Sequence, residues 1–481
     1  MKIDLISSAA QRPAADIAIL PFWEGPHEAA DLTPWREQIL PTLELGDFKG
    51  KHAEALWITG RGKEPRILLL GLGKPEALTV ECLRKVAAGV VKLKRGTKAN
   101  WLLPDFKALP REAALQGVFE GLLLTAYTYT TYKKADPMVT SVALIGAGPQ
   151  AKGILDHVTA IVRGVDFVRD LVNGNADEVT PEHLAKQATA LGKKTLKTTL
   201  FNRKRLEEKG FGLITAVGRA AEVEPYLIQV DYSGNPRSKE RIVLVGKGVT
   251  YDTGGLSLKP TDSMLTMKCD MAGGATVLGA IQVVADLGLK VNVTALVPTA
   301  ENAIGSGSYK LGDVYRAYNG KTVEINNTDA EGRLLLADAL AYAVKELKPS
   351  LIVDLATLTG AAVVALGEDI AALFTAHESL SSALLAASET TGEPLCRLPL
   401  WDSYLESFKS EIADLVNSGG REAGAVKAAL FLQEFVGKEI PWAHLDIAGP
   451  AYLTKPKHYH STRATGYGVR LLVDLIARQG S

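Results

Sequence analysis

The sequence predicts an α/β protein with two domains, each a mixed or mostly parallel sheet flanked by helices, joined by a long connector helix. Apolar runs of strand length alternate with longer helical patterns along almost the whole chain, and this alternation favours parallel strands that are buried between helices. At 481 residues the chain is also too long for one ordinary hydrophobic core. We therefore expect more than one domain.

Short apolar runs and longer periodic patterns locate the individual elements. Six continuous apolar runs predict buried strands, at 17–20, 66–70, 141–145, 242–245, 291–297 and 351–355. Three patterns with apolar residues at helical spacing predict helices, at 112–125, 275–287 and 334–347. The strands fall into an early group and a late group, so we expect one sheet in each domain.

The domain boundary is expected after the strand at 141–145. A single long amphipathic pattern follows at 149–172, and no further strand joins the early group. This helix is therefore expected to connect an N-terminal α/β domain (1–148) to a larger C-terminal domain (173–481). The later constellations of polar residues all lie in that second domain.

One glycine motif offers a different interpretation of the boundary. The run Gly146-Ala147-Gly148-Pro149-Gln150-Ala151 follows a strand and opens a helix, as the dinucleotide-binding fingerprint does. That fingerprint also needs a second strand that ends in an acidic residue about 20 residues later. The helical pattern instead continues past Asp166 and Asp170. We interpret the motif as a tight turn between domains.

Composition narrows the classes of partner and compartment. The 54 basic side chains equal the 54 acidic ones, so no overall field favours nucleic acid or an anionic membrane. Cys82, Cys269 and Cys396 are far apart and form no CxxC pair, which argues for a reducing compartment. No apolar run has the length of a membrane span, and the N-terminus lacks a signal pattern. We expect a cytoplasmic protein with no membrane partner.

The most informative run is Asn327-Thr328-Asp329-Ala330-Glu331-Gly332-Arg333, which precedes an apolar helical pattern. If the run is extended, the side chains of Asp329, Glu331 and Arg333 point the same way. Two carboxylates beside a guanidinium suit a metal cation with an anion next to it. Acidic residues before a helix are also ordinary caps, so this run alone leaves both interpretations open.

A second constellation lies upstream. Lys247 follows the strand at 242–245, Asp252 precedes a glycine pair, and Asp270 stands before a helix. Each has an ordinary interpretation, as a surface lysine, a turn former and a helix cap. Together with Asp329 and Glu331, however, they can surround two divalent cations about 3.5–4 Å apart with a hydroxide between them.

The two lysines of this region are expected to have opposite roles. Only a neutral amine can bind a metal, so the cations would have to depress the pKa of Lys247. Lys259 is expected to stay protonated and to polarise a carbonyl oxygen as negative charge develops. These segments contain no histidine, which weakens the case for a histidine-ligated zinc hydrolase but not for a carboxylate site.

These segments resemble the leucyl aminopeptidase (cytosol aminopeptidase) family, bacterial type. The resemblance runs from about Arg169 to the C-terminus, whereas the N-terminal third shows only a similar size and order of elements. The matching motifs are Val245-Gly246-Lys247-Gly248, Asp252-Thr253-Gly254-Gly255, Met267-Lys268-Cys269-Asp270-Met271, the run 327–333, 354–361 and 442–449. It implies a C-terminal catalytic metallopeptidase domain.

The resemblance implies two divalent metal ions, Mn²⁺ or Zn²⁺, with Mg²⁺ or Co²⁺ possible at an exchangeable site. One ion would be held by Lys247, Asp252, Asp270 and Glu331. The other would be held by Asp252, Asp329 and Glu331. The α-amine of a peptide would bind the first ion, so substrates would need a free N-terminus.

The family also implies the remaining roles. Lys259 would contact the scissile carbonyl oxygen, and Arg333 would hold a bicarbonate that relays a proton. The backbone at Thr357, Leu358 and Gly360 would line the substrate cleft. The implied function is removal of N-terminal residues, preferably of the leucine type, in intracellular peptide turnover by a homohexamer. A DNA-binding accessory or regulatory role on the same hexameric scaffold is the alternative, although zero net charge makes nucleic acid an unexpected partner.

Some positions depart from the family or are expected to be structural. Asn173-Gly174-Asn175 replaces a stretch that commonly contains proline, and Leu311 stands where proline is usual. Neither position is a proposed ligand, so these departures affect loop geometry. Asp354 and Asp446 lie on apolar strands and are expected to support the site, and His444 is expected to be a core histidine with its hydrogen bonds satisfied.

Overall fold

The computed structural model describes four ranges of the chain: 1–25, 32–106, 109–192 and 195–479. They form two compact units. Unit 1 contains Met1–Val162 and Pro456–Ser461, and unit 2 contains Arg163–Lys455 and Thr462–Ser481. Among the described residues, no helix has both the length and the apolar character that crossing a bilayer requires.

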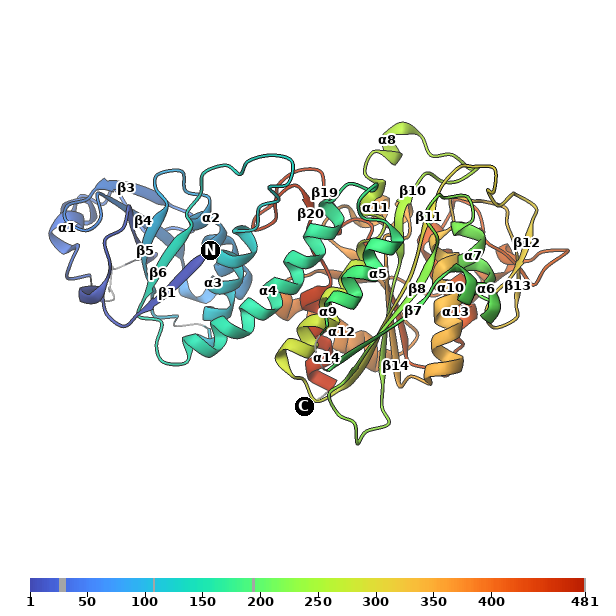
Figure 1. Cartoon of the computed structure of the whole chain (residues 1–481). Coiled ribbons are helices and arrows are strands. Elements are labelled where there is room, and N and C mark those ends of the chain that lie inside the picture. The colour runs from blue at the N-terminus through green and yellow to red at the C-terminus, as the bar shows by residue number, and fades with distance from the viewer. Residues whose placement is uncertain (26–31, 107–108, 193–194, 480–481) are drawn as a thin grey trace. The chain divides into compact units, whose positions relative to one another are not determined.

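Unit 1 is built on one six-stranded sheet (Figure 1). Its strands are β1 (Lys2–Ile6), β2 (Ile17–Trp23), β3 (Ala55–Thr59), β4 (Arg66–Gly73), β5 (Lys98–Leu102) and β6 (Ser141–Ile145). They lie in the order β1-β6-β5-β2-β4-β3, and only the β3–β4 pair is antiparallel. The helices are α1 (Arg36–Glu44), α2 (Val80–Val91) and α3 (Arg111–Thr125), of which α2 and α3 pack together.

The long amphipathic helix expected at 149–172 is α4 (Ala151–Asn173). The division between the two units falls inside this helix, after Val162. The glycine motif before it forms a turn, since Gly146 and Gly148 both have positive φ angles of 81° and 84°. The helix continues past Asp166 and Asp170 with no strand after it until β7 (Leu196–Phe201), so the geometry of a dinucleotide fold is absent there.

Unit 2 is built on a nine-stranded mixed sheet. The remaining strands of this sheet are β8 (Tyr226–Ser233), β9 (Ile242–Gly246), β10 (Gly248–Asp252), β11 (Asn292–Asn302), β14 (Leu351–Ala356), β15 (Ala371–Phe374), β16 (Leu395–Arg397) and β18 (Trp442–Asp446). The order is β16-β15-β18-β14-β9-β11-β8-β7, with β10 also beside β11. The central strands β18, β14, β9 and β11 are parallel to one another. Smaller sheets are formed by β12 (Val314–Arg316), β13 (Thr322–Glu324) and β17 (Leu415–Val416), and by β19 (Tyr452–Leu453) and β20 (Arg463–Ala464).

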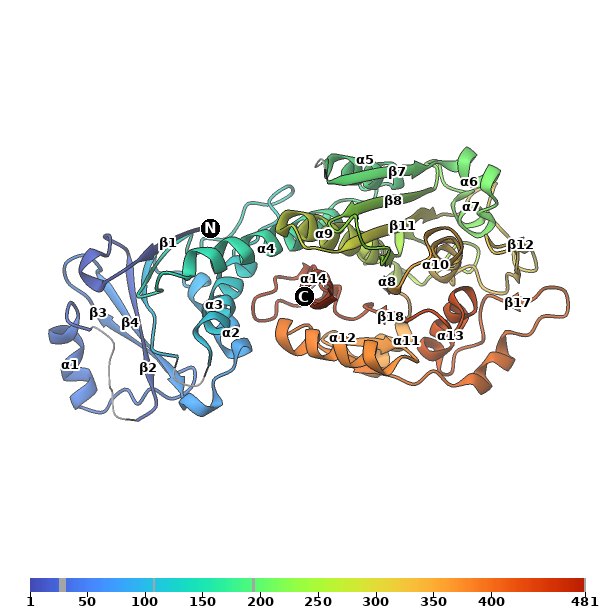
Figure 2. The ribbon, with the colours of Figure 1, turned by 90° about the horizontal axis from the view of Figure 1, so that it is seen from below.

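Helices cover both faces of the large sheet (Figures 1 and 2). On one face lie α9 (Ala272–Leu287), α12 (Glu378–Thr391) and α14 (Val469–Gln479), and on the other lie α7 (Gly212–Gly218), α10 (Gly332–Tyr342) and α13 (Gly424–Val436). The shorter or outer helices are α5 (Pro181–Ala190), α6 (Arg203–Lys209), α8 (Thr261–Met264) and α11 (Gly360–Leu366). Strands β9 and β14 are completely buried, as expected for strands covered on both faces. The predicted α/β class is confirmed.

Glycines allow α9 to press against the carboxyl ends of the central strands. A Cβ atom added at Gly273, in the first turn of α9, would lie 2.2 Å from the carbonyl oxygen of Leu355 in β14. A Cβ atom at Gly246, the last residue of β9, would lie 2.3 Å from the carbonyl oxygen of Gly273. Only glycine permits this approach, which brings Asp270, two residues before the first residue of the helix, close to the end of β9.

The predicted elements differ from the observed ones mainly at their ends. The strand expected at 291–297 continues to residue 302, and the helix expected at 334–347 begins at Gly332 and changes to a π-helical turn after Tyr342. Strand β10 is not predicted by any apolar run, because glycine opens it and polar residues close it. The run 327–333 is not extended: residues 328–329 form a turn and Gly332 begins α10.

Candidate active site

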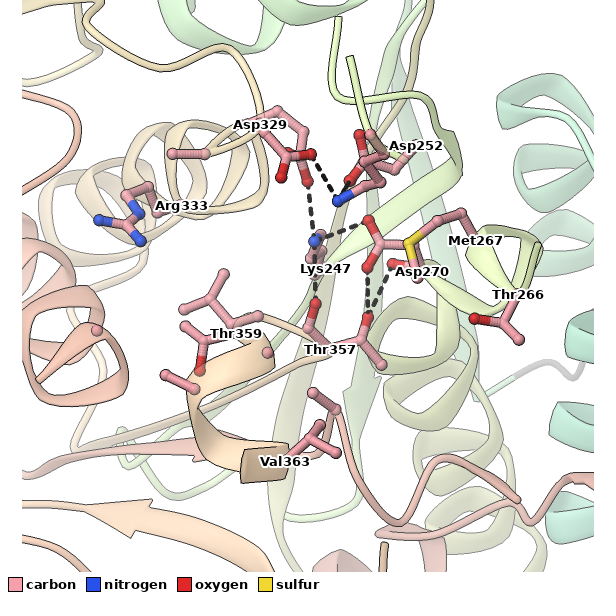
Figure 3. A pocket seen from close by; sticks show the side chains of 18 of the residues that line it. Lys247, Asp252, Thr266, Met267, Asp270, Asp329, Arg333, Thr357, Thr359 and Val363 are labelled. Carbon is pink, nitrogen blue, oxygen red and sulfur yellow. Dashed lines mark hydrogen bonds and ion pairs between the residues drawn. The ribbon is translucent and has the colours of Figure 1, made fainter. Parts of the chain in front are cut away.

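The candidate site lies at the carboxyl edge of the central strands in unit 2. Lys247 follows β9, Asp252 ends β10, and Thr357 follows β14. The loops before α9 and α10 add Asp270 and the signature run 327–333. These residues, apart from Thr328 and Gly332 of the run, line one cavity of about 460 Å³ (Figure 3). Sites commonly form at this edge of a parallel sheet, because several loops converge there.

Lys247 lies at the base of the cavity and is only 3% exposed. Its Nζ is 2.8 Å from Asp270 Oδ2 and 2.9 Å from Glu331 Oε1, and it donates a hydrogen bond of 3.0 Å to the carbonyl oxygen of Thr357. Burial opposes the charge of this ammonium group, but Asp270 and Glu331 outweigh burial and raise the pKa of Lys247 above its ordinary value. Lys247 is therefore not a surface lysine.

Lys259 forms a second ion-pair cluster, which is partly buried. Its Nζ is 2.9 Å from Asp252 Oδ2 and 2.5 Å from Asp329 Oδ1. Burial again opposes its charge, and Asp252 and Glu331 raise the pKa of Lys259 above its ordinary value. Burial and the neighbouring Glu331 raise the pKa of Asp252 to about 6, although Lys259 opposes this change. Four carboxylates and two ammonium groups thus share one space (Figure 3).

Three of these carboxylates converge. One oxygen each from Asp252, Asp329 and Glu331 lie within 4.8 Å of one another. The second oxygen of Glu331, Oε2, is buried and has no hydrogen-bond partner among the described residues. A buried carboxylate oxygen without a partner is costly, and a bound cation would remove that cost. This donor set of oxygens with one amine therefore fits divalent metal ions.

Glu331 occupies the N-cap position of α10 but its side chain makes no capping hydrogen bond. The carboxylate contacts Lys247 instead, so the interpretation of Glu331 as an ordinary cap is wrong. Arg333, in the first turn of α10, lies apart from the lysine–carboxylate cluster (Figure 3). The run is not extended, so the condition for a common orientation of its three charged side chains is not met. The carboxylates of Asp329 and Glu331 nevertheless converge, and only Arg333 lies apart from them.

The guanidinium of Arg333 makes no ion pair with the carboxylates of the cluster among the described residues. Its side chain is 9% exposed and donates one hydrogen bond, of 3.0 Å, to the carbonyl oxygen of Asn417. Its Nε is buried and has no partner in the described part of the chain. Burial lowers the pKa of Arg333 to about 10, which leaves the guanidinium charged at neutral pH. An unpartnered buried N–H on a cation fits a small anion.

The loop from β14 to α11 forms the opposite side of the cavity. Thr357, Leu358 and Gly360 all line it. The Thr357 hydroxyl donates to Asp270 Oδ1 at 2.8 Å, and the Leu358 amide donates to Asp446 Oδ1 at 3.1 Å. Hydrogen bonds from both ends of this loop therefore fix it against the site.

Both parts of the chain match the models of one family. The model of the cytosol aminopeptidase family, catalytic domain, matches residues 166–473, and the model of its N-terminal domain matches residues 19–136. The chain belongs to the cytosol aminopeptidase family. The N-terminal match extends the likeness beyond the region after Arg169, where the sequence motifs alone had placed it.

Two curated relatives are similar to this chain along almost its full length. The probable cytosol aminopeptidase of Protochlamydia amoebophila (strain UWE25) is 46% identical over 491 residues, covering 99% of this chain and 98% of the relative. The probable cytosol aminopeptidase of Chlamydia abortus (strain DSM 27085 / S26/3) is 46% identical, and 98% of each chain is covered. The chain is therefore an aminopeptidase, a metallo-exopeptidase that hydrolyses peptides.

Several solved structures share the fold of this chain. A tomato leucine aminopeptidase variant has a TM-score of 0.87 at 32% identity, covering 99% of this chain and 96% of its own. The bottromycin maturation enzyme BotP in complex with Mn has a TM-score of 0.87 at 33% identity, covering 97% and 100%. The cytosol aminopeptidase from Coxiella burnetii has a TM-score of 0.83 at 34% identity, covering 99% of each chain.

The polar residues behind this cytosol aminopeptidase site form a fixed network. His444 is fully buried, and its Nδ1 lies 2.6 Å from Asp354 Oδ1, while its Nε2 has no partner among the described residues. Asp354 also accepts a hydrogen bond of 2.7 Å from Trp442 Nε1. Asp446 accepts from the Leu358 amide and from the Thr359 hydroxyl. Both aspartates therefore contact supporting groups rather than the metal-binding cluster.

Sequence reasoning missed Asn417, which organises the signature loop of the family. Its amide oxygen accepts hydrogen bonds from the backbone amides of Asn326 and Asn327, and its Nδ2 donates to the carbonyl oxygen of Asn327 at 2.6 Å. Its own carbonyl oxygen accepts from Arg333. Asn417 is about 90 residues from this loop in the sequence, and no local pattern marks it.

Proposed function

We propose that this chain is a two-metal leucyl aminopeptidase that removes apolar, leucine-type residues from the N-termini of peptides in intracellular turnover. The observation that carries the proposal is the convergence of oxygens from Asp252, Asp329 and Glu331 within 4.8 Å, beside the partnerless Oε2 of Glu331. The cluster lines an open cavity, so a small substrate can reach it.

Lys247, Asp252, Asp270 and Glu331 would hold one divalent cation. Asp252, Asp329 and Glu331 would hold the other. When bound, the cations supply an activated water and a Lewis acid for the peptide carbonyl. The oxygen-rich donor set supports Mn²⁺ or Zn²⁺, with Mg²⁺ or Co²⁺ at an exchangeable site; one structural relative is described with Mn.

Lys259 and Arg333 would carry the remaining chemistry. The raised pKa keeps Lys259 protonated at neutral pH, so its ammonium group can stabilise negative charge on the scissile carbonyl oxygen. Arg333 has a buried, partnerless Nε and would hold a bicarbonate close to the reacting groups. The bicarbonate would relay a proton from water to the leaving amine.

The cavity wall supports a preference for apolar N-terminal residues. Thr357, Leu358 and Gly360 would position the peptide. The cavity is also lined by uncharged side chains that can bury an aliphatic group, from Met267, Leu358, Ala361, Val363 and Ala448. Peptide N-termini would enter with the free α-amine directed toward Lys247 and its carboxylate partners.

We propose the same organisation for the whole chain that the sequence predicts. An N-terminal domain (1–148) would serve oligomerisation or regulation, a connector helix (149–172) would follow, and residues 173–481 would form the catalytic domain. The protein would be a cytoplasmic homohexamer. The family resemblance and the names of the relatives support this proposal, and neither favours a DNA-binding role.

Metal removal tests the proposed function directly. Hydrolysis of leucine-p-nitroanilide should cease after chelation and dialysis, and should return when Mn²⁺, Zn²⁺ or Co²⁺ is added back. N-acetylated leucine-p-nitroanilide should be inert, because acetylation removes the free amine that binds the metal. Undiminished hydrolysis by the metal-free protein, or efficient cleavage of the acetylated substrate, would contradict the proposal.

Gly332→Ala should displace Lys247 and reduce metal binding. A Cβ atom at Gly332 would lie 2.4 Å from Lys247 Cε and 2.6 Å from its Nζ. Three short contacts hold Lys247 in place, so the methyl group forces a strained arrangement that costs roughly 1–3 kcal/mol. Metal content after dialysis against Mn²⁺ measures the effect.

Gly360→Ala is the matched control for this measurement. Gly360 lines the same cavity, but a Cβ atom there would meet nothing within 4 Å. The control variant should therefore bind as much Mn²⁺ as the wild type. Equal metal content in the Gly332→Ala variant would show that Lys247 is not a ligand in this position.

A further inference from the structure

Strand β11 ends at Asn302, which contacts the metal-binding cluster but does not line the cavity. Asn302 is completely buried, and it lies opposite Asp252 in the register of β10 and β11. Its Nδ2 donates one hydrogen bond to Asp252 Oδ1, at 2.8 Å, and another to the carbonyl oxygen of Thr328, at 3.0 Å. The two N–H groups of one amide thus bind both the last residue of β10 and the loop before α10.

The two carboxylate oxygens of Asp252 have different partners. Oδ1 accepts from Asn302 and also from the backbone amide of Gly254, at 2.8 Å. Oδ2 faces the cavity, where it is 2.9 Å from Lys259 Nζ. Two donors on one oxygen restrain rotation of the carboxylate, and they leave the other oxygen directed toward the cations.

Thr328 connects the loop before α10 to the loop after β10. Its carbonyl oxygen accepts from Asn302 Nδ2 and from the hydroxyl of Tyr309, at 2.7 Å. Its hydroxyl donates to the carbonyl oxygen of Gly254 and accepts from the amide of Ser257, both at 2.7 Å. Since Asp329 follows Thr328 directly, the position of Asn302 sets the spacing between the loops that carry Asp252 and Asp329.

The space around Asn302 is closely filled. Gly255 has a φ of 61°, and a Cβ atom there would lie 3.0 Å from Asn302 Oδ1 and 3.0 Å from Thr328 Oγ1. A side chain without an N–H donor at position 302 would leave Asp252 Oδ1 with one hydrogen bond fewer. The amide is therefore suited to this place by its donors.

We propose that Asn302 is a positioning residue of the metal centre, which orients Asp252 and holds the two metal-binding loops in register. The inference rests on the proposed function, because it takes Asp252 and Asp329 as metal ligands. It predicts that Asn302 acts on metal affinity and ligand geometry without touching the substrate. Loss of a hydrogen bond to a ligating group costs about 10–100-fold in metal affinity or activity.

The same strand provides a matched control. Asn292 opens β11 and is also buried, at 6% exposure. Its Nδ2 donates to the carbonyl oxygens of Asn235, Ser238 and Glu240, at the opposite edge of the sheet from the metal-binding cluster. Substitution of either asparagine removes a buried amide from one end of β11, but only Asn302 contacts a proposed ligand.

The test compares Asn302→Ala and Asn302→Leu with Asn292→Ala. The metal-free full chain is titrated with Mn²⁺ in a calorimeter. Both Asn302 variants should bind Mn²⁺ about 10–100-fold more weakly than the wild type. Asn292→Ala should bind Mn²⁺ with wild-type affinity. In the Co²⁺-loaded proteins, the visible absorption bands should shift in the Asn302 variants alone, because these bands report the ligand geometry. Leucine replaces the amide with a side chain of similar size, so one variant keeps the space filled.

Three results would overturn the inference. Wild-type Mn²⁺ affinity with unchanged Co²⁺ bands in the Asn302 variants would show that Asp252 needs no second donor. Equal weakening in Asn292→Ala would show a general loss of stability. In both cases the proposed function would stand, because the wild type would still bind metal. Absence of Mn²⁺ binding by the wild-type chain would instead overturn the proposed function together with this inference.

Discussion

Replacement of Lys259 by alanine is expected to lower kcat by about 10²–10³-fold, as loss of one donor that stabilises the transition state does. The ammonium group lies 2.9 Å from Asp252 and 2.5 Å from Asp329, at the mouth side of the cluster with 14% of its side chain exposed. Metal binding should persist or become tighter, because removal of a competing positive charge frees both carboxylates for the cations. Steady-state kinetics on leucine-p-nitroanilide and metal analysis measure the two effects separately.

Lys268→Ala provides the control for this prediction. Lys268 lies in the neighbouring segment before Asp270, but its Nζ donates to the carbonyl oxygen of Asn173 and not to the cluster. The control variant should keep both turnover and metal. Loss of metal in the Lys259→Ala variant would show that Lys259 holds the site together rather than acting on the substrate.

Glu331→Ala is expected to abolish metal binding and activity together. Glu331 is proposed to contact both cations, and its removal also leaves the buried ammonium group of Lys247 with Asp270 as its remaining short-range ion-pair partner. Breaking a buried ion pair by removing one partner costs about 3–5 kcal/mol. The metal-free variant should therefore unfold at a lower urea concentration than the metal-free wild type, as measured by circular dichroism.

Two comparisons make the Glu331 result specific. Glu331→Gln keeps the size of the side chain but not its charge, so it should lose metal with a smaller loss of stability. Glu368→Ala removes a carboxylate that lines the same cavity but is hydrogen-bonded to the Thr454 hydroxyl, and it should retain metal. Full metal occupancy in Glu331→Ala would refute the assignment of Glu331 as a ligand.

Local patterns were sufficient for the buried central strands and for most of the clustered side chains. Strands β9 and β14 are continuous apolar runs because both faces are covered, and such runs are visible in any single sequence. The rule that sites form at the carboxyl ends of parallel strands then placed Lys247 beside Asp270 before any contact was known.

Features that depend on contacts distant in sequence could not be predicted. The sequence left open whether the signature run is extended, and in the structure Asn327 forms a local turn in which its Oδ1 accepts from the Asp329 amide. Asn302 and Asn417 act on the site across 50 and about 90 residues, respectively. Each is an isolated polar residue at the end of a strand, and such residues are common at surface turns.

The ion pairs of Lys247 and Lys259 bear on the order in which the protein folds and binds metal ions. Each carboxylate of the cluster has an ammonium group within 3 Å, so the two lysines offset part of the negative charge without any cation. We therefore expect the chain to fold before it takes up metal ions. We also expect the supply of metal in the surroundings to set activity without changing the amount of folded protein.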